Sequence, residues 1–174
     1  MIKKIRIKLN TISHKISGMK VGNRSAVYPG AEISDPSSVK IGDDAVIYKQ
    51  VSVLSDNTGS LNMGHRSHVA PFSYLLIGTN KLEIGDDVAI GPFTSIFCLS
   101  NKVSKELHRN SYHNKNVKIG NNVFVGAQTI IMPGTVIDDN VVVSANSTVM
   151  GHLKSGGIYS GNPAKRIREI DGGN

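Results

Sequence analysis

The chain has 174 residues, a formal net charge of +7, one cysteine and 5% aromatic residues. The lone cysteine excludes an intramolecular disulfide framework, and the lack of a long apolar run or a signal-peptide core predicts a cytoplasmic protein without a transmembrane span. The basic residues gather near the two ends and accompany no recognition helix, aromatic stacking platform or zinc spacing, so they do not indicate a nucleic-acid-binding domain.

The first seventeen residues predict a short basic amphipathic helix. Ile5, Leu9, Ile12 and Ile16 are spaced by four, three and four residues, and lysine and arginine side chains lie between them. Two interpretations of the segment 1–17 stay open. It covers the open end of a repetitive fold, as a solenoid requires for solubility, or it contacts the inner face of a membrane.

Residues 18–158 carry an aliphatic side chain at every sixth position. This period fits neither a helix nor an alternating strand, and it is typical of a parallel β-helix in which three six-residue units complete one triangular coil. The sequence therefore predicts an all-β domain of about six coils. The aliphatic residues form six triplets, which are Val21, Val27, Ile33; Ile41, Ile47, Val53; Met63, Val69, Leu75; Ile84, Ile90, Ile96; Ile119, Val125, Ile131; and Ile137, Val143, Val149.

Extra residues interrupt the period only after a completed triplet. All insertions are therefore expected to leave the prism at the same corner. Three of them are small, whereas the fourth, at 97–118, separates Ile96 from Ile119 by 23 positions where six are expected. A loop of this length is often functional, and we expect the chemistry to reside in it.

Three segments resemble the hexapeptide-repeat acyltransferases, in their branch of sugar and xenobiotic O-acetyltransferases. They are residues 82–96, residues 117–136, and Ser160-Gly-Asn-Pro-Ala-Lys-Arg166 within the tail 159–174. The resemblance covers roughly residues 20–168, and the Gly-Asn-Pro-Ala-Lys run is its most specific part. It implies a left-handed β-helix and a homotrimer with active sites in the clefts between neighbouring prisms.

The resemblance also implies that acetyl-CoA is a co-substrate and that no metal takes part. The pantetheine arm would lie against small residues at the coil corners, where a thin chain needs close approach to the backbone. Lys165 and Arg166 match tail positions near the adenosine phosphates, which are favourable ligands for fixed cations. The small corner residues are Gly126, Ala127, Ser144 and Ala145.

In this family a histidine in the loop after the fourth triplet acts as general base on the acceptor hydroxyl, which then attacks the thioester. The matching stretch here is Cys98-Leu-Ser-Asn-Lys102, so lysine stands at the histidine position and Asn101 is the candidate substrate-binding residue. Three interpretations stay open. Lys102 is the base, with a lowered pKa; His108 or His113 from the same loop is the base; or the site is inactive.

We therefore predict an acetyl-CoA-dependent O-acetyltransferase that modifies a saccharide hydroxyl, in a surface polysaccharide or its nucleotide-linked or lipid-linked precursor. The first alternative is a catalytically degenerate trimeric CoA-binding or scaffold protein. The second is a zinc carbonic anhydrase, with His108, His113 and either His65 or His68 as ligands. Their place in an irregular loop argues against the zinc site, because prism walls would have to hold the ligands rigidly.

Overall fold

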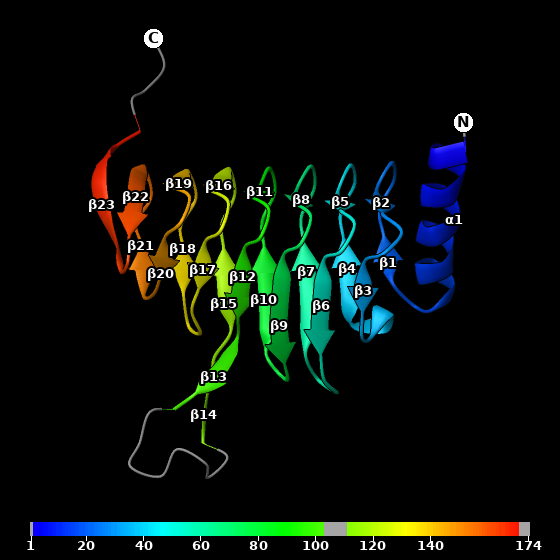
Figure 1. The fold of residues 1–174 in the computed structure, drawn as a ribbon, viewed down its shortest axis with the longest axis horizontal. Helices are drawn as coiled ribbons and strands as arrows, with labels where there is room; N and C mark the ends of the chain where they lie inside the picture. The colour runs from blue at the N-terminus through cyan, green and yellow to red at the C-terminus, as the bar shows by residue number, and fades with distance from the viewer. Residues whose placement is uncertain (1, 103–110, 171–174) are drawn as a thin grey trace.

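The computed structural model describes residues 2–102 and 111–170. One helix, α1 (Ile2–Ile16), precedes the coils of a parallel β-helix, and each coil contributes one strand in turn to three parallel sheets, A, B and C (Figure 1). Sheet A contains β1 (Lys20–Val21), β4 (Val39–Ile41), β7 (Ser60–Met63), β10 (Lys81–Ile84), β15 (Val117–Ile119), β18 (Val136–Ile137) and β21 (His152–Leu153).

The two other sheets follow the same coil-to-coil order. Sheet B contains β2 (Ala26–Val27), β5 (Val46–Ile47), β8 (His68–Val69), β11 (Ala89–Ile90), β16 (Val123–Val125), β19 (Val141–Val143), β22 (Gly157–Gly161) and β23 (Ala164–Glu169). Sheet C contains β3 (Glu32–Ile33), β6 (Ser52–Ser55), β9 (Tyr74–Gly78), β12 (Ser95–Phe97), β17 (Ile130–Ile131) and β20 (Thr148–Val149). A 3₁₀ turn, Pro36–Ser38, connects β3 to β4.

The aliphatic residues of the predicted triplets stack in three columns inside the prism. In sheet A, Val21 pairs with Ile41, and the same register continues coil by coil to Ile137. All eighteen are buried except Val21 and Ile33, which are half-buried in the first coil. Burying one such side chain contributes about 2 kcal/mol, so the columns account for much of the stability. The predicted left-handed β-helix is confirmed, and its six-residue register is correct.

The register extends one step beyond the predicted triplets. Leu153 pairs with Ile137 in sheet A, and Tyr159 pairs with Val143 in sheet B, so a partial seventh coil follows. Strand β22 runs past residue 158, and after the cis Asn162–Pro163 bond strand β23 folds back on it in antiparallel direction. This pairing covers the last parallel edge of sheet B, which would otherwise be open to pairing with another chain.

Helix α1 lies across the N-terminal end of the prism, and the chain ends on the opposite end (Figure 1). A left-handed glycine ends the helix. Gly18 has φ +99°, its N–H donates to the Lys15 carbonyl, and the Met19 N–H donates to the His14 carbonyl, each at 3.0 Å. Met19 is buried and joins the core. Across the described ranges we find no helix with the length and apolar character needed to span a membrane.

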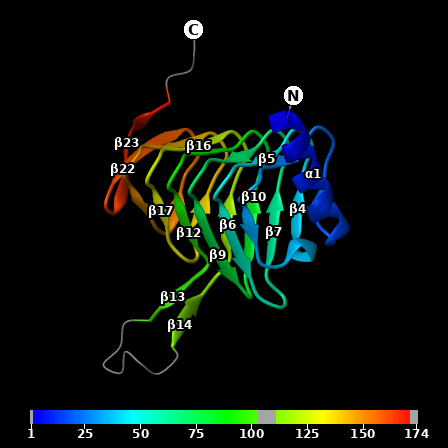
Figure 2. The same ribbon diagram turned by 45° about the vertical axis from the view of Figure 1, so that its right-hand side comes forward.

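The long insertion begins and ends as an antiparallel hairpin of β13 (Leu99–Asn101) and β14 (Tyr112–Asn114). It leaves sheet C after β12 and returns to sheet A at β15, and it projects away from the prism (Figure 2). At its base the Lys115 N–H donates to the Cys98 carbonyl at 2.9 Å. Cys98 is buried there, and this burial raises the pKa of its thiol to about 11.

Candidate functional site

The corner between sheets B and C carries the small residues that the sequence assigns to a cofactor arm. Gly126 follows β16 and is buried, and a Cβ there would lie 2.3 Å from the Ala145 nitrogen in the next coil. Its N–H donates to the Val143 carbonyl at 2.8 Å, as the Ser144 N–H does to Tyr159. Coil stacking alone therefore explains the glycine at position 126.

The backbone amides of Ala127 and Ala145 provide a sharper signal at this corner. Within residues 2–102 and 111–170, neither N–H donates a hydrogen bond to a backbone or side-chain acceptor. The equivalent position in three other coils is proline, at Pro29, Pro71 and Pro92, which has no N–H to leave unpaired. In the second coil it is Lys49, whose N–H also has no acceptor among the described residues. Two free donors on adjacent coils suit an extended ligand that carries amide carbonyls, because such donors require an acceptor from outside the chain.

Sequence reasoning missed an aromatic pair at the same corner. Phe72 and Phe93 stack with ring centroids 5.0 Å apart and planes 4° apart. Both are exposed and both have a left-handed backbone, with φ +64° and +59°. A bulky residue seldom adopts this conformation. Because the two rings are exposed, packing within the chain does not explain why it occurs here. The Pro-Phe dipeptides 71–72 and 92–93, at equivalent positions, are the signal that could have identified the pair.

The hairpin carries the candidate catalytic and substrate-binding residues. Ser100 pairs with His113 and Asn101 pairs with Tyr112, while the Lys102 N–H donates to the Ser111 carbonyl at 2.8 Å. The side chains of Asn101, Lys102 and His113 are exposed, and those of Lys102 and His113 form no hydrogen bond or ion pair with other described residues. His108 lies outside the described residues.

A single chain does not bring these two groups together. The hairpin leaves at the corner between sheets C and A, whereas Gly126, Ala127, Ser144 and Ala145 lie at the corner between B and C. Figures 1 and 2 both show the hairpin projecting from the prism away from the sheet B strands. A complete site therefore needs either a ligand that spans a prism face or a second prism whose hairpin reaches this corner.

The two tail cations differ in their surroundings. Lys165 is exposed opposite Ser160 in the β22–β23 pair. Arg166 donates to the Ser155 carbonyl at 3.0 Å, forms an ion pair with the Glu169 carboxylate, and lies 6.0 Å from the centre of the Tyr159 ring. Arg166 thus already holds the tail against the last coil, while the Lys165 ammonium extends into solvent.

The corner between sheets A and B forms a self-contained ladder. At each coil a side chain accepts the backbone N–H of the preceding coil: Asn23 donates to Asp43, Asp43 to His65, His65 to Asp86, Asp86 to Asn121 and Asn121 to Asp139, at 2.6–3.0 Å. The ladder residues from His65 to Asp139 line a shallow groove of about 750 Å³. The backbone donors of the ladder are already satisfied, so the groups that the groove leaves open are side chains of sheet A such as Lys40, Glu83 and Lys118.

The histidines proposed as zinc ligands are dispersed. His65 belongs to the A–B ladder, His68 projects from the outer face of sheet B, and His113 lies on the hairpin. The part of one chain that the structure describes holds no group of three or more His, Cys, Asp or Glu side chains placed to bind a metal. His68 packs edge-on against Tyr48 with ring centroids 6.0 Å apart, and burial lowers its pKa.

The outer faces of sheets A and B differ in polarity. Sheet A points mostly charged or polar side chains outward, including Lys40, Glu83 and Lys118. Sheet B points a nearly continuous apolar row outward, and Phe124 in this row is 51% exposed. The row consists of Ala26, Val46, His68, Ala89, Phe124, Val142 and Ile158. A face of this kind is typical of a protein–protein contact.

Comparisons with known proteins agree with this architecture. The family "Bacterial transferase hexapeptide (six repeats)" matches residues 116–151. The galactoside O-acetyltransferase of Escherichia coli strain K12 is 33% identical over 61% of this chain and 53% of its own length. The dTDP-4-amino-4,6-dideoxy-D-glucose acyltransferase of Escherichia coli is 26% identical over 94% of this chain and 86% of its own length.

Among solved structures, a mutant of AntD, an N-acyltransferase from Bacillus cereus in complex with dTDP and coenzyme A, is similar. It has a TM-score of 0.80 and 26% identity, over 91% of this chain and 87% of the other. The chain spans about half the length of the curated relatives that it matches at more than 30% identity. With the coil register and these similarities together, the chain is similar to the hexapeptide-repeat acyltransferases in fold and in part of its sequence.

Proposed function

We propose that the protein transfers an acetyl group from acetyl-CoA to a saccharide hydroxyl. The free N–H groups of Ala127 and Ala145 are the observation that carries this proposal. They offer two donors, one coil apart, to the amide carbonyls of a pantetheine arm, and the Lys165 ammonium extends into solvent from the following coil. The similarity to a structure that holds coenzyme A supports the same ligand.

The reaction needs a group that accepts the proton of the acceptor. The hydroxyl oxygen attacks the thioester carbonyl carbon, the carbon–sulfur bond breaks, and the coenzyme leaves as a thiolate that is then protonated. His113 and His108 are the candidate bases, and Lys102 is the third candidate. Asn101 lies between Ser100 and Lys102 on β13, where its side chain could contact the acceptor.

A homotrimer would complete this site. The hairpin and the B–C corner lie on different edges of one prism, so the cleft between two prisms would bring the hairpin of one chain to the corner of the next. The outward-pointing apolar row of sheet B, in which Phe124 is exposed, and the Phe72–Phe93 stack support such a contact. We expect light scattering to give the mass of three chains, and Phe124→Glu to lower that mass and abolish transfer.

A second candidate acceptor is the amino group of a nucleotide-linked sugar. Two observations favour it. Two of the relatives that match nearly the full chain are named as an acyltransferase of an amino sugar and as an N-acyltransferase, whereas the galactoside O-acetyltransferase matches over a shorter part. In addition, Lys102 replaces the expected histidine, and a neutral amine needs less help from a base than a hydroxyl does.

The test is acyl transfer from acetyl-CoA to matched acceptors, a hydroxyl sugar and an amino sugar carried on the same nucleotide, with the released thiol and the product mass measured. The double variant His108→Ala/His113→Ala should lower transfer to a hydroxyl by about 10²–10⁴-fold while calorimetry still detects CoA binding. Full activity of the double variant toward a hydroxyl would indicate that Lys102 is the base. Absence of CoA binding by the unmodified protein would overturn the proposed function.

A further inference from the structure

Helix α1 points its apolar face away from the protein. The four aliphatic residues at intervals of four, three and four form an exposed row together with Ile2. Ile2 and Ile12 lie at the margins of this row, where they also line cavities between the helix and the first coil. Their exposed fractions are 74% for Ile2, 50% for Ile5, 60% for Leu9, 40% for Ile12 and 82% for Ile16. We call this row the outer stripe. A helix that served only to cover the end of the prism would bury this stripe.

The opposite face of α1 attaches to the first coil mainly through polar groups. The Asn10 side-chain amide donates to the Val27 carbonyl at 3.0 Å, and the Val27 N–H donates to the Thr11 hydroxyl at 3.0 Å. Thr11 is buried, and Ile7 and His14 beside it are half-buried. These contacts satisfy the backbone N–H and carbonyl of Val27 at the edge of the first coil. The end of the prism is therefore covered without the outer stripe.

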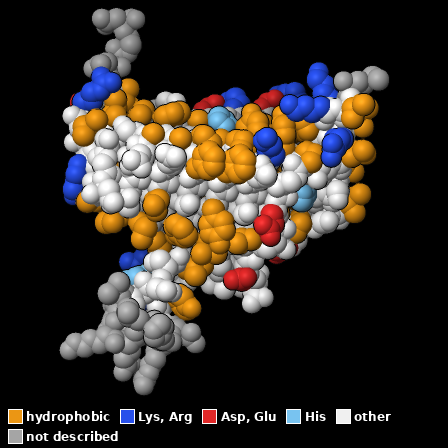
Figure 3. Space-filling view, viewed as in Figure 1, with side chains coloured by type: hydrophobic (Ala, Val, Ile, Leu, Met, Phe, Trp, Pro, Cys, Tyr) orange, Lys and Arg blue, Asp and Glu red, His pale blue; other side chains and the backbone are white. Residues whose placement is uncertain are grey.

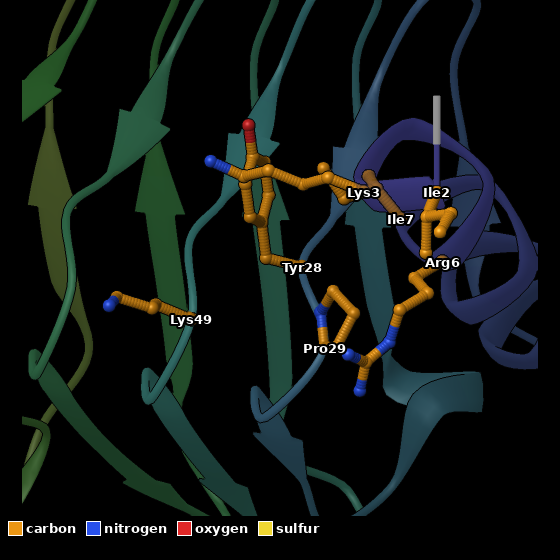
Figure 4. Close-up of a pocket in the computed structure, with 7 residues that line it drawn as sticks. All are labelled: Ile2, Lys3, Arg6, Ile7, Tyr28, Pro29 and Lys49. Atoms are coloured by element: carbon orange, nitrogen blue, oxygen red, sulfur yellow. The ribbon is translucent and has the colours of Figure 1, made fainter.

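Cations border the outer stripe on both sides. Lys3 and Arg6 lie on one flank, where they line a cavity of about 360 Å³ with Tyr28, Pro29 and other residues. In Figure 4 both side chains extend from α1 toward the Tyr28–Pro29 corner, and Lys49 lines the same cavity from the second coil. Lysines line a second cavity, of about 390 Å³, on the other flank; they are Lys4, Lys8 and Lys15.

The helix contains no acidic residue, so all its charged side chains are positive. Figure 3 shows hydrophobic side chains at the end of the molecule where α1 lies in Figure 1, with lysine and arginine side chains next to them. This arrangement has the apolar row outermost and the cations set back on each side. In a bilayer surface the acyl chains lie beneath the anionic headgroups. The apolar row would therefore meet the acyl chains, and the cations would meet the headgroups.

We propose that α1 binds an anionic lipid surface, lying in the plane of the headgroups with the outer stripe inserted. The stripe contributes apolar burial, and the flanking lysine and arginine side chains reach back to the headgroups. A second copy of the chain is a poorer partner, because two stripes face to face would also bring two sets of cations together. A soluble polyanion would use the cations and leave the stripe in water.

The proposed trimer would strengthen this binding. Prisms packed side by side about a threefold axis present their N-terminal ends on the same side, so three α1 helices would meet one surface. Attachment through three weak contacts is much tighter than through one. This step rests on the proposed trimer, whereas the lipid preference of a single α1 does not.

The test compares binding of the full chain to vesicles of phosphatidylcholine alone and of phosphatidylcholine with about 30% phosphatidylglycerol. We expect binding to the anionic vesicles that weakens as salt rises. Leu9→Ser/Ile12→Ser/Ile16→Ser should raise the lipid concentration for half-binding at least about tenfold. Lys4→Gln/Lys8→Gln/Lys15→Gln should raise it to a similar extent. The matched control removes three lysines from the outer face of sheet A, in Lys20→Gln/Lys40→Gln/Lys118→Gln, and should bind as the unmodified protein does.

Three results would overturn the proposal. The first is equal binding, or none, to the neutral and anionic vesicles. The second is unchanged binding by the serine variant while the glutamine variant loses it, because that pattern describes a soluble polyanion site. The third is a change in the mass of the serine variant in lipid-free solution, since the stripe would then be a contact between copies. Circular dichroism checks that each variant folds, and CoA binding, measured separately, keeps a failure here distinct from a failure of the proposed function.

Discussion

The A–B and B–C corners of the prism are built from the same hexad positions, but they differ in whether one backbone N–H has an acceptor within the chain. At the A–B corner the N–H two residues after the buried aliphatic is accepted by a side chain of the next coil, as where His65 donates to Asp86 at 2.7 Å. At the B–C corner this position is proline in some coils, and at Ala127 and Ala145 it is an N–H without an acceptor in the described residues. The A–B corner satisfies its donors from Asn23 to Asn121 within the chain, whereas the B–C corner leaves those of Ala127 and Ala145 open to water or a ligand.

The difference separates structural from functional corners without reference to residue type. Both corners carry glycine and small polar residues, so composition does not distinguish them. The hydrogen-bond inventory does, because an unpaired donor at the surface is available to water or a ligand. Variants at the two corners test this separation, and the pH dependence of stability gives the smallest expected effect.

The largest effect should come from adding one carbon to the A–B corner. A Cβ at Gly85 would lie 2.6 Å from the Gly120 carbonyl oxygen and 2.7 Å from its carbon, so the coils would have to separate. We expect Gly85→Ala to lower the free energy of unfolding by about 3 kcal/mol, measured by urea denaturation. Glu83→Ala, two residues earlier on the exposed face of β10, serves as control and should change little. Equal stability of the two variants would show that the corner tolerates separation.

Proline substitution tests the open donors of the B–C corner directly. Ala127→Pro/Ala145→Pro removes both N–H groups at a hexad position where other coils already carry proline. We expect the double variant to fold normally and to bind CoA roughly tenfold or more weakly, measured by calorimetry. Lys49→Pro makes the same change in the second coil, away from the proposed cofactor, and should leave CoA affinity unchanged. Unaltered CoA affinity in the double variant would show that these amides do not bind the cofactor.

A smaller effect is expected from breaking one step of the A–B ladder. Asp86 accepts the His65 N–H, and Asp86→Ala leaves that donor to water, at a cost of about 1 kcal/mol in the free energy of unfolding. Asp86→Asn keeps an acceptor, as Asn121 does in the next coil, and should retain most of the stability. CoA affinity should stay constant in both variants. A loss of affinity would show that the A–B corner also takes part in cofactor binding.

The smallest effect is on pH dependence. Burial lowers the pKa of His68 and of His14, so the folded protein favours their neutral forms. The unfolded chain, with histidine pKa values near 6.5, binds protons more readily as the pH falls, and the stability that is present above about pH 6.5 is lost below it. We expect a lower urea midpoint at about pH 5.5 than at about pH 7.5. The decrease should be smaller in His68→Gln, and an identical decrease would exclude His68 as a contributor.

Much of the fold was predictable because the residues that point into the prism recur every six positions along the chain. Each column residue, from Val21 to Val149, points inward at a fixed interval, and insertions occur only after a complete triplet. The N-terminal helix was predictable from the spacing of its aliphatic residues. The partial seventh coil was missed, because Tyr159 is an aromatic residue at an aliphatic position.

The sequence by itself determined the core, the place of the long insertion, and the identity of the corner residues, because these depend on local period and turn chemistry. It left open which face of residues 2–16 meets the prism, and tertiary structure decided this through the polar contacts of Asn10 and Thr11 with Val27. Tertiary structure also decided which corner donors are already satisfied. The buried face of the helix and the satisfied donors both depend on contacts between residues at least sixteen positions apart. A periodic pattern in the sequence does not specify such contacts.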